Sequence, residues 1–290
     1  MTKQELIKYS VNELITKQNP EVIKTAFSEN YIAHAENKKH KGHSFLKRFS
    51  EILLTSIPDI KVVKIEFLAE DIVSFMSEPK AEDFHRVRAG IKLLYRASAM
   101  RVTSAAGTDL TIDVSDAPCG GTAGFSTYDK GVSHWPGGLC LCFPGKNTVN
   151  GTIVMNRGDL NLTFKEYLRE PITLTVENDF IVDIAGDNLD AELFRNYLDA
   201  WDDPDAYSFS HVGWGMNTTA RWESLAMYDK GDLQGTELRA FAGNFLFSTG
   251  SNEYANRFTP AHFDLPMRGC TIALDDKVIV DEGVLQGELA

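Results

Sequence analysis

The stretch Thr259-Pro260-Ala261-His262-Phe263-Asp264-Leu265-Pro266 carries a histidine and an aspartate two residues apart. Side chains of an extended segment alternate between its two faces, so His262 and Asp264 point the same way if this segment is extended. A second stretch, Ser210-His211-Val212-Gly213-Trp214-Gly215, supplies another imidazole. The separation between His211 and His262 is 262 − 211 = 51 residues, so the tertiary fold has to bring the two segments together.

Two imidazoles and one carboxylate are the ligand set of a facial triad, which leaves positions on Fe(II) open for substrate and O2. The pattern therefore predicts a metal site at His211, His262 and Asp264. A second interpretation stays open, because a chain with seven histidines and 41 acidic residues can contain one His-x-Asp match by chance. In that case the pair is a hydrogen-bonded histidine and a turn aspartate between two prolines.

The size and charge of the chain restrict its class. A chain of 290 residues is expected to form about two domains of ~150 residues. Its apolar fraction of 43% is typical of a globular protein with a sizeable core. The net charge of −12 repels phosphate backbones, so we expect no nucleic-acid partner. We interpret the short basic run Lys38-Lys39-His40-Lys41 as a solvated loop.

The apolar segments of the chain are short. None approaches the ~20 residues that a membrane-spanning helix needs, so we expect no membrane partner. The opening Met1-Thr2-Lys3-Gln4-Glu5 leads directly into an amphipathic pattern, without the apolar region of a signal peptide. These features predict a cytoplasmic protein.

The cysteines give no sign of a zinc site, because no Cys-x-x-Cys pair is present. In Cys140-Leu141-Cys142 the two thiols are predicted to share one face of a strand. Buried, reduced thiols are the expected role in a cytosolic chain. The four are Cys119, Cys140, Cys142 and Cys270.

The periodicity of apolar residues predicts an α+β protein. Residues 1 to 57 read as helices, the last of them over 42–57, and two strands follow at 61–67 and 72–75. Further helices are predicted over 84–95, 189–201 and 218–227. Glycine and proline punctuate a region rich in strands, predicted at 100–104, 109–114, 139–143, 152–155, 172–176, 180–184 and 277–280.

The first part of the chain resembles SnoaL-like polyketide cyclases, which are cone-shaped α+β barrels. The resemblance is carried by Asn30-Tyr31-Ile32-Ala33-His34, Lys41-Gly42-His43-Ser44-Phe45 and Ile57-Pro58-Asp59-Ile60, the last followed by two predicted strands. The later strands that close the cone, and the acid/base residue they carry, are missing. The resemblance therefore implies half of such a barrel, a partial domain over residues 1–76.

The remainder resembles the family of 2,5-dihydroxypyridine 5,6-dioxygenase and its aminopeptidase T-like relatives, over about residues 84–280. This implies a strand-rich α+β metal-binding catalytic domain over 77–290. The segments that carry the resemblance are 101–110, 134–138, 151–154, 169–174, 210–215, 243–250, 259–266 and 274–277.

In this family the histidine of the His-x-Gly-Trp-Gly segment and both polar residues of His-x-Asp bind iron. The resemblance thus implies Fe(II) at His211, His262 and Asp264. His134 matches a family histidine close to the substrate, which implies a proton shuttle or a hydrogen-bond donor, with a packed turn as the alternative. The family carries an acidic residue where this chain has Thr122.

The resemblance implies a mononuclear non-haem Fe(II) dioxygenase that cleaves a hydroxylated heteroaromatic ring, such as 2,5-dihydroxypyridine, with O2. Trp214, Phe245 and Phe247 either wall its aromatic pocket or pack in the core. One alternative is an aminopeptidase-like hydrolase using Zn2+ and a carboxylate base such as Glu192 or Glu223. Another is a non-catalytic protein that binds a small molecule or dimerises. An incomplete cone leaves strand edges unpaired, so we expect a homo-oligomer.

Overall fold

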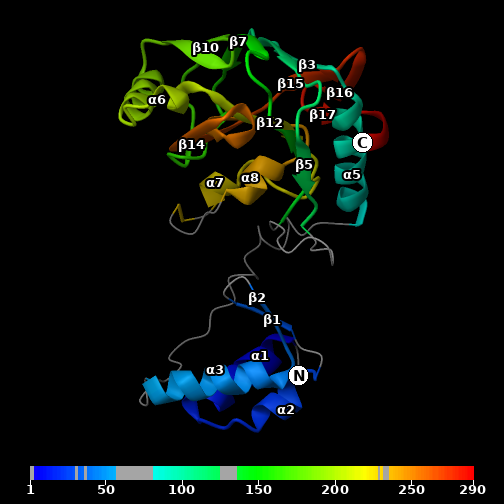
Figure 1. Ribbon diagram of the computed structural model, residues 1–290, viewed down its shortest axis with the longest axis vertical. Helices are drawn as coiled ribbons and strands as arrows, with labels where there is room; N and C mark the ends of the chain where they lie inside the picture. The colour runs from blue at the N-terminus through cyan, green and yellow to red at the C-terminus, as the bar shows by residue number, and fades with distance from the viewer. Residues whose placement is uncertain are drawn as a thin grey trace. The chain divides into compact units, whose positions relative to one another are not determined.

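The computed structural model describes residues 3–29, 32–35, 38–56, 81–124, 136–227, 229–230 and 235–290. The chain divides into two compact units, residues 1–71 and 72–290, which are described separately (Figure 1). None of the described helices is both long and apolar enough to cross a membrane.

The first unit is mainly helical. Its small core consists of Leu14, Val22 and Ile23, joined by half-buried apolar neighbours. The helix predicted over 42–57 is confirmed as α3, but the basic run predicted to be a loop is a strand, β2, that pairs with β1. The described elements are α1 (Lys3–Val11), a π-helical turn (Asn12–Thr16), α2 (Val22–Ala26), β1 (Ile32–Ala35), β2 (Lys38–Lys41) and α3 (His43–Ser56).

The strands predicted at 61–67 and 72–75 lie outside the described residues. The described part of this unit holds one two-stranded sheet, β1–β2, so half of a cone-shaped barrel is not shown.

Among its described residues, the second unit contains two large antiparallel sheets and a small two-stranded one, β8 (Leu160–Asn161) paired with β9 (Glu166–Tyr167). The larger runs in the order β11-β10-β7-β4-β3-β15-β16-β17 within the described residues. All the strands predicted for it from the sequence are confirmed, whereas β15 and β17 were not predicted. Its strands are β3 (Ala99–Ser104), β4 (Asp109–Asp113), β7 (Val149–Met155), β10 (Ile172–Glu177), β11 (Phe180–Ala185), β15 (Cys270–Leu274), β16 (Lys277–Asp281) and β17 (Val284–Leu285).

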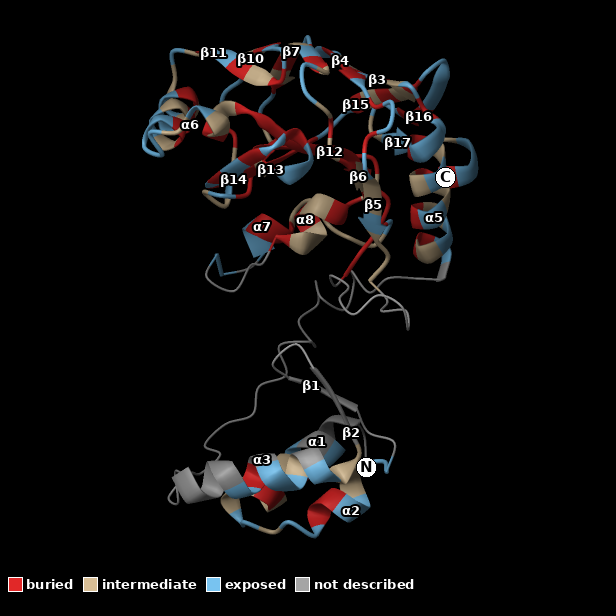
Figure 2. Cartoon of the chain, in the orientation of Figure 1, coloured by how far each residue is buried: buried red, intermediate tan, exposed pale blue. Residues whose placement is uncertain are grey.

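The smaller sheet runs in the order β14-β13-β12-β6-β5. Buried residues run along every strand of this sheet except β5 (Figure 2), and every residue of β12 is buried. Of these strands only β6 was predicted. They are β5 (Cys119–Thr122), β6 (Leu139–Cys142), β12 (Phe209–Gly215), β13 (Phe245–Asn252) and β14 (Arg257–Met267).

One hydrophobic core joins the two sheets. Trp214, Phe245 and Phe247 of the smaller sheet are fully buried in the same cluster as Val102 and Leu110 of the larger one. Of the two roles that the sequence left open for these three side chains, their burial supports core packing. The strength of this core comes from removing large apolar side chains from water.

The helices of this unit lie around the sheets (Figure 1): α5 (Ala81–Arg96) packs on β5 and β6, and α8 (Thr236–Ala240) on β12 and β14. The predicted helices over 84–95 and 189–201 are confirmed as α5 and α6 (Leu189–Asp199). The helix predicted over 218–227 is wrong for its first half, since α7 spans only Ser224–Met227. Asn217 Oδ1 accepts hydrogen bonds from the backbone N–H groups of Thr219 and Ala220, which gives this backbone a turn in place of a helix.

The cysteines follow the alternation of β6. Cys140 and Cys142 are both buried in the core on one face of the strand, as predicted. All four cysteines are unpaired, and burial raises the pKa of the Cys140 thiol well above its ordinary value. The thiols of Cys140, Cys142 and Cys270 are therefore buried core groups of low reactivity, whereas Cys119 is half-buried and a hydrogen bond with the Cys142 thiol lowers the pKa of its own thiol.

Candidate metal centre

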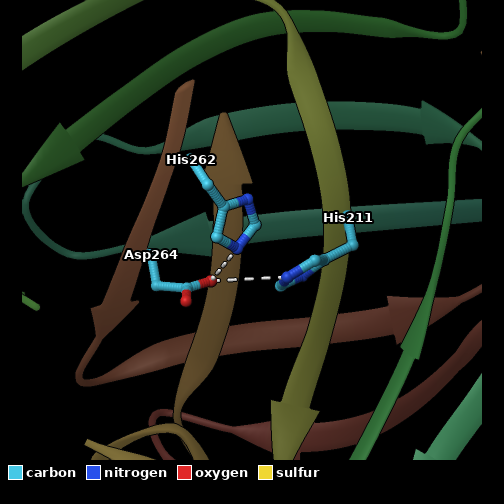
Figure 3. A group of neighbouring side chains, drawn as sticks. All are labelled: His211, His262 and Asp264. Atoms are coloured by element: carbon cyan, nitrogen blue, oxygen red, sulfur yellow. Dashed lines mark ion pairs between the residues drawn. The ribbon is translucent and has the colours of Figure 1, made fainter. Parts of the chain in front are cut away.

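The smaller sheet carries the three predicted ligands on two strands. His262 and Asp264 lie on the edge strand β14, His211 lies on β12, and β13 runs between them. Figure 3 shows the three side chains turned toward one another. The prediction that His262 and Asp264 share one face of an extended segment is confirmed.

Phe263, between the two ligands, fixes which face of β14 they occupy. Its side chain is fully buried on the opposite face, with its ring 4.7 Å from that of Phe194 and 4.8 Å from that of Tyr197. A slip of one residue in the β13–β14 register would expose this ring and bury the ligands in its place. Hydrophobic packing thus directs the polar side chains into the site.

Ser248 occupies the position between the ligands on β13. It pairs with Asp264, and its hydroxyl accepts a hydrogen bond from the backbone N–H of His211 at 3.0 Å. This bond falls where the β12–β13 ladder is irregular, between Phe209 and Val212. Such irregularities redirect a side chain out of the regular alternation. His211 on β12 and Asp264 on β14 are two strand spacings apart, about 9–10 Å. Their side chains can meet because the residue between them on β13, Ser248, is small.

The ligand atoms converge on one oxygen. Nε2 of His211 lies 3.3 Å, and Nε2 of His262 3.4 Å, from Oδ1 of Asp264. All three ligand atoms lie within 4.8 Å of one another. The Asp264 side chain is 4% exposed and that of His262 45% exposed, so the site is open on the His262 side.

Arg239 of α8 holds the other carboxylate oxygen. Its Nε donates to Oδ2 of Asp264 at 2.7 Å, and Nη2 lies 2.6 Å from the same oxygen. Burial by itself would raise the pKa of the Asp264 carboxyl. The neighbouring His211 and His262 rings and the charge of Arg239 outweigh burial and hold this pKa well below its ordinary value. Asp264 is therefore an anion, which is the form that binds a cation.

A cavity of about 560 Å³ opens between α8 and the sheet at this point. Its size falls in the range of small-molecule sites. Apolar and polar groups share its wall, and the described lining residues are Gly121, Thr122, Leu139, Leu141, His211, Thr236, Arg239, Ala240, His262 and Asp264.

Other predicted site residues are not all in this cavity. His134 lies outside the described residues. Thr122 is on the cavity wall, whereas the described lining includes neither Glu192 nor Glu223. Glu223 forms an ion pair with Arg221 instead.

Sequence reasoning missed Ser248 and Arg239. Nothing in the local pattern marks either one, because a serine in a strand and an arginine in a short helix are ordinary. Only the β13–β14 pairing and the position of α8 give these residues a role.

Comparison with known proteins supplies independent information. The family model described as NicX, 2,5-dihydroxypyridine 5,6-dioxygenase, matches residues 63–287. The 2,5-dihydroxypyridine 5,6-dioxygenase of Pseudomonas putida KT2440 is 40% identical over 207 residues, which are 71% of this chain and 59% of that protein. The match thus spans less than two thirds of this relative's length.

Two solved structures are similar. The first is the 2,5-dihydroxypyridine dioxygenase from Pseudomonas putida KT2440, with a TM-score of 0.72 and 29% identity, covering 94% of this chain and 89% of that one. The second is wild-type AmpT from Thermus thermophilus, with a TM-score of 0.54 and 17% identity, covering 73% of this chain and 57% of that one. The second likeness concerns the fold alone.

Proposed function

Since the chain belongs to the 2,5-dihydroxypyridine 5,6-dioxygenase family, we propose that it is a mononuclear non-haem Fe(II) dioxygenase that opens a hydroxylated heteroaromatic ring such as 2,5-dihydroxypyridine with O2. The observation that carries the proposal is the convergence of His211, His262 and Asp264 at one wall of a cavity. An enzyme is the class that the family match supports, and the site offers the ligand set for it.

The three residues fit a divalent metal ion. Ligand atoms about 2.1 Å from an ion and adjacent in an octahedral shell lie about 3 Å apart, close to the 3.3 and 3.4 Å from Oδ1 of Asp264 to the two imidazoles. This oxygen is buried and has no hydrogen-bond partner among the described residues. A buried carboxylate oxygen without a partner is costly, and a cation would remove that cost.

Two imidazoles and a carboxylate suit iron and leave room for exogenous ligands. Iron held there would supply the electron transfer to O2 that organic side chains lack. We assign His211, His262 and Asp264 as its ligands.

The cavity wall supports binding of a small ring. Leu139 and Leu141 provide apolar surface for its faces, and Thr122 and Thr236 provide hydroxyl groups for its polar substituents. The guanidinium of Arg239 adds positive charge, which favours a substrate with an ionised hydroxyl group. At the position of the family's acidic residue this chain has Thr122, so the wall carries no negative charge there, and the preferred ring can differ for that reason.

A proton must leave the substrate hydroxyl when it ionises, and we assign its acceptor to His134, because imidazole exchanges protons near neutral pH. His134→Gln would flatten the pH dependence of kcat. An unchanged pH profile would remove His134 from the reaction.

We also propose that residues 1–76 form a separate SnoaL-like partial domain. A further proposal is that the protein is a homo-oligomer. The β1–β2 hairpin has no third strand among the described residues, and open strand edges attract partners. Light scattering coupled to size-exclusion chromatography measures the mass in solution, and the mass of a monomer would contradict the proposed homo-oligomer.

The test of the activity is O2 consumption by protein loaded anaerobically with Fe(II), with and without 2,5-dihydroxypyridine. We expect substrate-dependent uptake that His262→Ala abolishes. The matched control is His85→Ala, which removes an exposed histidine of α5 and should leave uptake unchanged. Bound iron without uptake would favour a different substrate, whereas zinc binding with peptide hydrolysis would favour the aminopeptidase-like alternative.

A further inference from the structure

The two carboxylate oxygens of Asp264 have separate surroundings. Oδ2 contacts Arg239 through both Nε and Nη2. Oδ1 faces the imidazoles of His211 and His262. The carboxylate therefore stands between an arginine on one side and the open ligand position on the other.

This division matters because a carboxylate turns easily about its Cβ–Cγ bond, whose torsional preference is broad and two-fold. An unrestrained Asp264 could offer either oxygen, or both, to a metal ion. An arginine fork forms short, charge-assisted hydrogen bonds of fixed direction and holds the group in one orientation. Burial of Asp264 strengthens these bonds, since its side chain is only 4% exposed.

Arg239 is itself held in place by the fold. Its backbone N–H donates to the carbonyl of Gly235, and its carbonyl accepts from Nδ2 of Asn244, a fully buried side chain. Gly235 begins the turn at a φ of +78°, a conformation that glycine adopts without strain. The arginine thus has a fixed origin on α8, which packs on the two ligand-bearing strands.

We propose that Arg239 is a positioning residue for the metal site: by holding Oδ2 of Asp264, it presents Oδ1 alone to the ion bound by His211 and His262. The proposal rests on the metal centre proposed above. Partners that orient a metal ligand in this way typically change metal affinity by about 10–100-fold when removed.

The test is titration of metal-free protein with Co(II), read by calorimetry and by the visible absorption spectrum of the bound ion. Arg239→Gln should weaken Co(II) binding about 10–100-fold and alter the spectrum, because the carboxylate is free to turn. Arg239→Lys, which keeps the charge without the fork, should recover part of the affinity. It also serves as the second variant if Arg239→Gln does not fold.

Arg101→Gln is the matched control. It removes an arginine that makes a two-point contact with Asp109 on the exposed surface of the larger sheet, and it should leave both readouts unchanged.

A double-mutant cycle separates positioning from a general structural effect. In an Asp264→Asn background, Arg239→Gln should change Co(II) affinity less than about two-fold, since its target carboxylate is gone. An equal loss in both backgrounds, or a wild-type affinity and spectrum in Arg239→Gln alone, would overturn the proposal. Failure of the unmodified chain to bind Co(II) would instead refute the metal centre, and the role of Arg239 with it.

Discussion

Replacing Ser248 with alanine tests how the fold builds the site. The Ser248 hydroxyl is buried and accepts the hydrogen bond of the His211 N–H at 3.0 Å, at the irregularity in β12. Alanine leaves this buried donor without a partner, which costs about 1–3 kcal/mol. For a unit of this size each kcal/mol lowers the melting temperature by about 2–4 °C. The expected decrease is therefore roughly 2–12 °C in metal-free protein.

Scanning calorimetry provides the measurement, and Ser224→Ala provides the control. Ser224 is as fully buried as Ser248, but its hydroxyl has no hydrogen-bond partner in the described part of the chain. Its replacement should be neutral or slightly stabilising, because no bond is lost. Equal melting temperatures for Ser248→Ala and the unmodified protein would refute the claim that this hydroxyl holds His211. Ser248→Thr, which keeps the hydroxyl, should lose less stability than Ser248→Ala.

Three further predictions concern the surroundings of the site. Phe263→Ala should cost about 3–5 kcal/mol of unfolding free energy, measured in urea, whereas Phe258→Ala, at a ring 70% exposed, should cost little; equal losses would contradict the packing argument. Burial raises the pKa of Asp159 to about 6, so the native state keeps a proton that the unfolded state releases, and stability falls as pH rises from about 4 to about 6. In Asp159→Asn the unfolding free energy should fall by up to about 3 kcal/mol less over this pH range than in the unmodified protein. The same fall in both proteins would contradict this role of Asp159. Gly250→Ala should be destabilising by thermal unfolding, since φ is +103° and the new Cβ would lie 2.0 Å from the carbonyl oxygen of Ala261; an unchanged melting temperature would mean that the strands yield there.

The ligands were accessible from sequence because their chemistry is local. His-x-Asp in an extended segment places both side chains on one face whatever else the chain does, and β14 has this geometry. The alternating strands at 172–176 and 180–184 were accessible for the same reason, and they form the β10–β11 hairpin. In each case the period of the pattern equals the period of the strand.

The errors have physical causes too. β12 is buried along its whole length, so it lacks the alternation by which a half-buried strand is recognised. In Lys38–Lys41 the pairing with β1 outweighs a composition typical of loops. Near residue 218 the side chain of Asn217 competes for backbone hydrogen bonds, and no count of apolar residues reveals that competition.

Residue types and short periods were enough to identify the chemistry of the site, two imidazoles and one carboxylate, and the α+β class of the fold. Three features of the site come from the folded chain alone: β13 separates the ligand strands, Ser248 leaves space between them, and Arg239 holds the second carboxylate oxygen. These contacts join segments 16 to 37 residues apart, 264 − 248 = 16, 264 − 239 = 25 and 248 − 211 = 37, through sheet pairing and helix packing. Pairing of this kind depends on the packing of the whole core, which no local pattern contains.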